Sequence, residues 1–218
     1  MAIDPNDFII TRKRKKYKFA VFANLENCFE FEEWDKTWQP QTLEVGAGSG
    51  LFSTSMAQAL GEKYLAVDVK ADRLQQGAQL ALEQQVSNIR FLRSRVDQLP
   101  ELISPASLQK IWVTFPDPFP KKRAAKHRLT HPRYLSLYQN MLAKTGALYF
   151  KTDSRELFDY SLEQLVDQQW SIEELSFDLH ESRLNEAYKT RTSYEERFMK
   201  EGIAINFVKA RPPAILDS

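Results

Sequence analysis

Two acidic residues of the 218-residue chain lie within or next to segments that are rich in proline or glycine. Asp117 lies between prolines in the segment FPDPFP, residues 115–120, and Glu44 directly precedes a glycine-rich turn, GAGSG, at residues 46–50. Proline fixes φ, whereas glycine reaches backbone conformations that other residues rarely adopt. Each segment follows an apolar run. We therefore expect both acids to be held in place at the ends of buried strands.

The glycine turn joins a predicted strand, 42–45, to a predicted helix, 51–60. Its backbone N–H groups and the helix N-terminus can approach a ligand closely. A dinucleotide-binding loop reads GxGxxG, but Leu51 fills the sixth position here, and Glu44 would repel a pyrophosphate. An acid at that position suits a cationic ligand without phosphate, such as S-adenosylmethionine.

A further acid, Asp68, ends the next predicted strand, 20 residues after Gly48. A carboxylate at this place can accept both hydroxyls of a ribose. Glu44, Gly46, Gly48 and Asp68 are thus expected to form an S-adenosylmethionine site. A plain tight turn and an NAD site are the alternatives for this segment.

The proline loop runs directly into a basic segment. Its basic side chains are Lys121, Lys122, Arg123, Lys126, His127 and Arg128, and a second basic segment, RKRKKYK, occupies residues 12–18. The whole chain carries a formal net charge of only +1. Two basic segments on a nearly neutral chain predict a local docking surface for a polyanion, and solvated surfaces are the alternative. An acid fixed beside phosphate-binding groups suits a substrate base within a nucleic acid.

The elements that must position these residues alternate along the chain. Strands are predicted at 42–45, 64–67, 88–92, 111–115, 148–150, 172–177 and 203–209, and helices at 51–60, 71–85, 131–142 and 156–168. The pattern predicts an α/β fold of the Rossmann-like kind, with a mostly parallel, seven-stranded sheet and helices on both faces. Ligands of such sheets bind beyond the carboxyl ends of the strands, where both acids are expected.

Composition excludes several classes of protein. The single cysteine, Cys28, cannot form an internal disulfide, and with three histidines it argues against a zinc site. No apolar run approaches the roughly 20 residues of a membrane span, and no secretory signal is visible. We therefore expect a cytoplasmic protein without a metal or a membrane partner, and a monomer and a homodimer fit equally well.

Four motifs taken together resemble the tRNA (guanine-N7)-methyltransferase family. They are the glycine turn, FPDPFPKKR at residues 115–123, KTD at 151–153 and TSYE at 192–195. The family's usual Trp in the second motif is replaced by Phe119. The resemblance covers roughly residues 42–208. It implies a class I methyltransferase fold, with a basic N-terminal extension at 1–40 and an S-adenosylmethionine-dependent methyltransferase domain at 41–218.

The resemblance also implies roles for individual residues. Asp117 would be the catalytic acid, near both cofactor and guanine, and Glu44, Gly46, Gly48 and Asp68 would bind S-adenosylmethionine. The family's acid near the adenine aligns with Arg95, so Arg95, Asp97 or the backbone around Val96 would make that contact. The substrate nucleotide would be bound by Lys121, Asp153, Thr192 and Glu195, and RNA phosphates by Lys122, Arg123, Lys126 and Arg128.

The implied activity is methylation of N7 of a guanine, position 46, in the variable loop of tRNA. Guanine N7 has a lone pair at neutral pH, so the reaction needs alignment rather than a general base. The alternatives are a methyltransferase acting on a small molecule or a protein, and a non-catalytic RNA-binding module. An oxidoreductase is disfavoured by Glu44 and Leu51.

Overall fold

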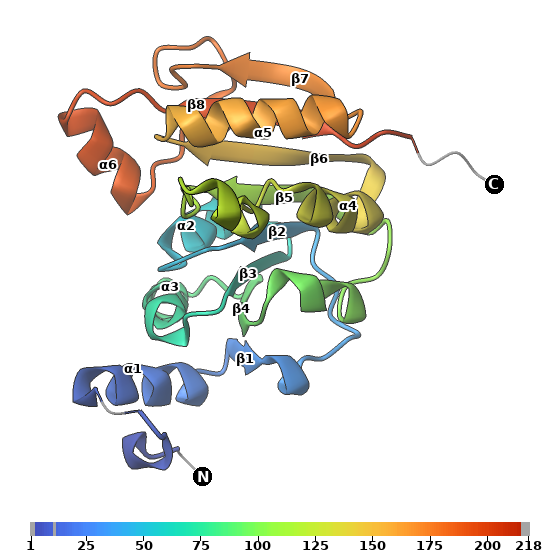
Figure 1. The fold of residues 1–218 in the computed structure, drawn as a ribbon. Coiled ribbons are helices and arrows are strands. Elements are labelled where there is room, and N and C mark those ends of the chain that lie inside the picture. Colours follow the sequence, from blue (N-terminus) through green and yellow to red (C-terminus); the bar gives the residue numbers. More distant parts are fainter. Residues whose placement is uncertain (1–2, 11, 215–218) are drawn as a thin grey trace. The chain divides into compact units, whose positions relative to one another are not determined.

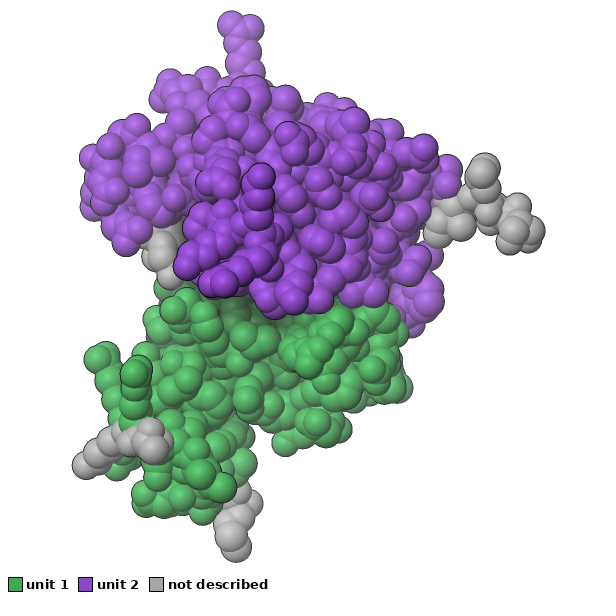
Figure 2. All heavy atoms as spheres, viewed as in Figure 1, with its two compact units in different colours: residues 1–102 green, residues 103–218 purple. Residues whose placement is uncertain are grey.

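The computed structural model describes residues 3–10 and 12–214 and contains two compact units, residues 1–102 and 103–218 (Figure 2). We call them the N-terminal unit and the C-terminal unit. The predicted boundary between an extension, 1–40, and a domain, 41–218, stays a prediction, and residues 1–2, 11 and 215–218 of these ranges lie outside the described part. None of the described helices combines the length and the apolar character that crossing a bilayer requires.

The N-terminal unit contains four parallel strands in the order β1-β4-β3-β2 (Figure 1). Its elements are α1 (Lys13–Asn24), β1 (Cys28–Glu30), β2 (Thr42–Val45), α2 (Leu51–Leu60), β3 (Tyr64–Asp68), α3 (Ala71–Glu83) and β4 (Ile89–Arg93), with short 3-10 turns at Pro5–Asp7, Phe31–Glu33 and Val96–Glu101. Every residue of β2 is buried, as is β3 up to Val67. Such near-continuous burial is typical of parallel strands covered on both faces.

The C-terminal unit has the strand order β5-β6-β8-β7 (Figure 1). Its elements are β5 (Leu108–Thr114), η4 (Lys122–His127), α4 (Pro132–Met141), β6 (Leu142–Thr152), α5 (Arg155–Asp167), β7 (Ser171–Ser176), η5 (Glu186–Lys189), α6 (Ser193–Lys200) and β8 (Asn206–Arg211), where η denotes a 3-10 helix. β5 and β6 are parallel, and β8 is antiparallel to both β6 and β7. The helix α5 lies across β6, β7 and β8.

The mostly parallel α/β fold is confirmed, with two corrections. The described residues form eight strands rather than seven, because the short strand β1 pairs with β4 through Cys28 and Phe91. Three residues carry too little hydrophobic periodicity to predict a strand. β6 is also much longer than the predicted 148–150. The prediction missed its first half because the exposed residues Lys144 and Thr145 interrupt the apolar pattern.

The basic N-terminal segment forms the first half of the helix α1. Phe19, Ala20 and Phe22 of this helix are buried, and α1 packs against α3. Arg14 and Lys15, by contrast, are exposed. Apolar anchors at the C-terminal end thus fix a helix whose basic residues cluster at the other end.

Candidate functional site

The glycine turn of the N-terminal unit is fastened to the end of β3. The N–H groups of Gly46 and Ala47 donate to the carbonyl oxygen of Val67 at 2.8 and 3.0 Å. The carboxylate of Asp68 accepts from the N–H of Gly48 at 2.9 Å and from the N–H of Lys70 at 2.8 Å. Asp68 therefore lies directly at the turn, and each of its carboxylate oxygens accepts a backbone N–H.

Gly48 leaves room for a ligand at this point. Its φ is +57°, and a Cβ built on it would meet no atom within 4 Å. The turn thus presents backbone and an open space next to the Asp68 carboxylate.

A different glycine, Gly50, serves the packing of two helices. It caps α2 with a φ of +73°, and its backbone approaches Gly77 on α3. A Cβ built on Gly77 would come within 2.7 Å of the Gly50 Cα, and one built on Gly50 within 2.7 Å of the Phe91 ring. The N–H of Gly77 also donates to the carbonyl of Ser49 at 2.8 Å. The third glycine of the turn is therefore a contact between helices.

Glu44 is fully buried in β2 below the turn. The hydroxyl of Ser53 on α2 donates a hydrogen bond to its carboxylate. Burial, together with the charge of Glu44, raises the pKa of the Tyr64 hydroxyl well above its usual range. A buried acid acts on nearby groups through a low-dielectric interior, where its field is less screened than in water.

Arg95 and Asp97, predicted near the adenine, bind each other. The guanidinium donates to both carboxylate oxygens of Asp97, one of them at 2.9 Å through Nε. The N–H of Arg95 donates to the Gln98 side chain at 3.1 Å at the start of the 3-10 turn. The carboxylate of Asp97 is therefore already engaged, and the backbone at Val96 remains the third candidate for the adenine contact.

The proline loop of the C-terminal unit has a strained backbone on both sides of Asp117. Phe115 and Phe119 have φ values of +47° and +43°. Non-glycine residues in this region cost about 1–3 kcal/mol each and persist where the surroundings hold them. The N–H of Phe115 donates to the carbonyl of Lys151 on β6 at 2.9 Å. Asp117 itself is exposed.

Arg128 holds the other side of this loop. Its guanidinium donates to the carbonyls of Pro118 at 3.0 Å and Phe119 at 3.1 Å, and it lies 4.4 Å from the Tyr160 ring centroid. It also pairs with Glu156 at 3.4 Å. Only 6% of Arg128 is exposed, so the predicted contact with RNA phosphates does not suit it. Arg128 instead holds the proline loop through the carbonyls of Pro118 and Phe119.

The other basic residues of this segment differ from Arg128. Lys121 directly precedes η4, and the side chains of Lys121, Lys122, Arg123 and Lys126 are all exposed. They can reach a phosphate backbone without displacing packed structure.

Asp153 follows β6 as Asp117 follows β5. The two strands are parallel neighbours, and Thr114 is paired with Lys151. The loops after them therefore leave the same edge of the sheet. Asp153 is half-buried, whereas Asp117 is exposed.

Thr192 and Glu195, predicted to bind the substrate nucleotide, are both buried. The Thr192 hydroxyl accepts from the Glu195 N–H at 3.0 Å, and the Glu195 carboxylate accepts from the Thr192 N–H at 2.7 Å. This reciprocal capping box begins α6. Only 6% of Thr192 and none of Glu195 is exposed.

Sequence reasoning missed the partners of Glu195. Lys151 Nζ lies 2.7 Å from Glu195 Oε1, and both side chains are fully buried. His180 places Nε2 at 3.2 Å from the same oxygen. A lysine at the end of an apolar strand was a usable signal, because a buried lysine nearly always has a carboxylate partner.

Among the described residues, no three or more His, Cys, Asp and Glu side chains are grouped so that they could hold a metal ion.

The fold has close counterparts among solved structures. A 30S ribosomal A1408 methyltransferase from an uncultured bacterium has a TM-score of 0.62 at 13% identity, covering 83% of this chain and 95% of that one. The 16S rRNA methyltransferase KamB has a TM-score of 0.60 at 15% identity, covering 84% and 93%. The fold is that of the class I methyltransferases.

Sequence comparison identifies the methyltransferase family to which the chain belongs. Residues 38–208 match a family described as "Putative methyltransferase". The tRNA (guanine-N(7)-)-methyltransferase of Cytophaga hutchinsonii is 38% identical over 213 residues, which cover 90% of this chain and 96% of the relative. That of Lachnoclostridium phytofermentans is 36% identical, covering 94% and 90%. The chain belongs to the tRNA (guanine-N7)-methyltransferase family.

Proposed function

We propose that this protein transfers a methyl group from S-adenosylmethionine to N7 of guanine 46 in the variable loop of tRNA. The observation that carries the proposal is the exposed Asp117, which is held in a strained proline loop beside the exposed basic side chains of η4. Family membership and two exposed or half-buried acids at one sheet edge, Asp117 and Asp153, support the same conclusion.

In this proposal the N-terminal unit binds the methyl donor. Gly46 and Gly48 form the turn, Gly48 leaves open space beside it, Asp68 accepts from the ribose hydroxyls, and the charge of Glu44 favours a cationic ligand. Arg95, Asp97 or the backbone at Val96 contacts the adenine. When bound, S-adenosylmethionine supplies an electrophilic methyl group on a positively charged sulfur.

The C-terminal unit recognises the guanine. Asp117 and Asp153 accept hydrogen bonds from the N1–H and N2–H₂ groups, and adenine lacks this pair of donors. N7 needs no base to expose its lone pair, so these acids serve to orient the ring. A carboxylate beside the purine also stabilises the positive charge that the ring gains on methylation. Asp117 is therefore the catalytic residue, and Lys121 contacts the nucleotide.

The exposed basic side chains of η4 bind the RNA backbone. Lys122, Arg123 and Lys126 neutralise phosphates, which gives affinity that depends on salt but little on sequence. Reaching a base in folded RNA requires drawing it from its stack, and the docking energy offsets that cost. Thr192 and Glu195 were also predicted to contact the substrate. Both are buried, and in this proposal they fix the conformation of the segment before α6.

The test is methyl transfer from labelled S-adenosylmethionine to unmodified tRNA transcripts, with protein extract and small-molecule extract as competing substrates. We expect label in 7-methylguanosine of tRNA alone. Asp117→Asn should lower kcat/KM by about 100- to 1,000-fold, because one preorganised electrostatic group is lost. Label in protein or small molecules, or full activity of Asp117→Asn with an unchanged circular dichroism spectrum, would contradict the proposal.

A further inference from the structure

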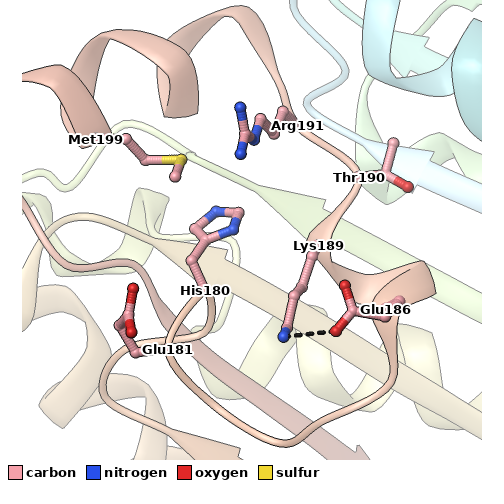
Figure 3. Close-up of a pocket in the computed structure, with 7 residues that line it drawn as sticks. All are labelled: His180, Glu181, Glu186, Lys189, Thr190, Arg191 and Met199. Carbon is pink, nitrogen blue, oxygen red and sulfur yellow. Dashed lines mark hydrogen bonds and ion pairs between the residues drawn. The ribbon is translucent and has the colours of Figure 1, made fainter.

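The C-terminal unit contains a polar pocket of about 420 Å³. It is lined by His180, Glu181, Glu186, Lys189, Thr190, Arg191 and Met199, which come from the loop after β7, from η5 and the segment following it, and from α6 (Figure 3). Arg191 lies directly before the TSYE motif and belongs to none of the four motifs. Its side chain points from the loop into the space between His180 and Met199 (Figure 3).

The backbone on both sides of Arg191 is fixed by one buried ion pair. On the N-terminal side, Lys151 Nζ donates to the carbonyl of Thr190 at 3.0 Å. On the C-terminal side, Glu195 Oε2 accepts from the N–H of Thr192 at 2.7 Å. Lys151 and Glu195 are themselves 2.7 Å apart and fully buried. The pair therefore anchors the peptide before and after Arg191 to the sheet strand β6.

Two cations, Lys189 and Arg191, and two acids, Glu181 and Glu186, line the pocket. Of the two cations, Arg191 is the better placed to meet an anion. Lys189 Nζ lies 2.7 Å from Glu186 Oε1 and also donates to the carbonyl of Ser182 at 2.9 Å. His180 directs Nε2 at Glu195. Arg191 is exposed. Its planar guanidinium can make two parallel hydrogen bonds to phosphate oxygens.

We propose that Arg191 binds a backbone phosphate of the tRNA at this pocket, and that Lys151 and Glu195 are positioning residues that present it. The proposal rests on the proposed function, because it assumes that tRNA is the substrate. It assigns Glu195 to holding the segment rather than to touching the nucleotide, in keeping with its complete burial.

The first test is the salt dependence of binding to an unmodified tRNA transcript, for the wild type, Arg191→Ala and Arg191→Lys. Arg191→Ala should lower the slope of log K against log[salt] by about one, and Arg191→Lys should retain the slope because it keeps the charge. The matched control is Arg183→Ala, which removes an exposed arginine that does not line the pocket. An unchanged slope in Arg191→Ala, or an equal fall in Arg183→Ala, would overturn the proposal.

Steady-state kinetics provide a second readout. Arg191→Ala should raise the KM for tRNA and leave the KM for S-adenosylmethionine unchanged. If both KM values rise together, Arg191 affects the whole enzyme and is not a phosphate contact. Wild-type protein that fails to methylate tRNA rejects the proposed function, whereas an active wild type with equal salt slopes rejects only the role of Arg191.

The positioning role is tested in a Lys151→Met/Glu195→Gln background. Both charges are removed together, so neither is left buried without its partner. In this background Arg191→Ala should change the salt slope by much less than one. A full effect of Arg191→Ala in that background would show that Arg191 acts without the pair and would overturn the positioning role.

Discussion

Arg128 is the side chain that ties the proline loop to the body of the C-terminal unit. One guanidinium reaches two loop carbonyls, the Glu156 carboxylate and the face of Tyr160. The carbonyl of Phe119 is one of the two, and Phe119 carries a φ of +43°. The same residue that looks like part of a basic RNA-binding run thus stabilises the conformation that holds Asp117.

Arg128→Lys should weaken this support while keeping the charge. A lysine cannot donate to both carbonyls in a fixed fork, and hydrogen bonds from charged groups contribute about 1.5–3 kcal/mol. We expect the free energy of unfolding to fall by about that amount and methyl transfer to decline, with the affinity for S-adenosylmethionine unchanged. Urea denaturation, calorimetry and rate measurements check this.

The control is Arg133→Lys, at an exposed arginine next to Tyr134. It should change stability by no more than about 0.5 kcal/mol. If Arg128→Lys matches this control in both stability and activity, Arg128 does not support the loop.

At the scale of elements, the glycine turn depends on how closely α2 and α3 approach. Gly50 and Gly77 meet backbone to backbone, and any side chain at Gly77 enters the space of the Gly50 Cα. The helix α3 therefore fixes where the turn lies, although it contributes none of the predicted cofactor contacts.

Gly77→Ala should displace the turn. The added methyl group meets backbone that cannot move aside, and such overpacking costs about 1–3 kcal/mol. We expect lower thermal stability and weaker binding of S-adenosylmethionine by calorimetry. Gln76→Ala, at an exposed neighbour on the same helix, should leave both unchanged. Wild-type affinity and stability in Gly77→Ala would refute the close contact.

Local patterns predicted most of the elements but few of the long-range partners. The strand 42–45 and the helix 51–60 have the predicted limits, because their apolar periodicity and the glycines at both helix ends are local signals. The burial of Arg128 depends on Tyr160 and Glu156 on another helix, α5. The pairing of Lys151 with Glu195 likewise joins residues far apart in the chain. No single stretch of sequence contains that information.

For the molecule as a whole, charge is distributed so that a nearly neutral protein can bind a polyanion. The formal net charge is +1, yet Lys122, Arg123 and Lys126 stand exposed within one 3-10 helix. The affinity for tRNA should therefore depend on where a charge lies more than on the total.

Replacing Lys122, Arg123 and Lys126 by Gln should lower the slope of log K against log[salt] for tRNA by roughly three. A control that replaces the exposed Lys36, Lys63 and Lys144 removes the same total charge and should change the slope far less. Fluorescence anisotropy over a salt series measures both. Equal slopes for the two triple variants would contradict a docking surface on η4.

The most direct measurement compares two tRNA transcripts that differ only at position 46, one with guanine and one with adenine. Each is incubated with the pure protein and S-adenosylmethionine, and the nucleosides are mapped by mass spectrometry. The account predicts one 7-methylguanosine at position 46 of the first transcript and none in the second. Methylation of both transcripts at another position, or of neither, would contradict it.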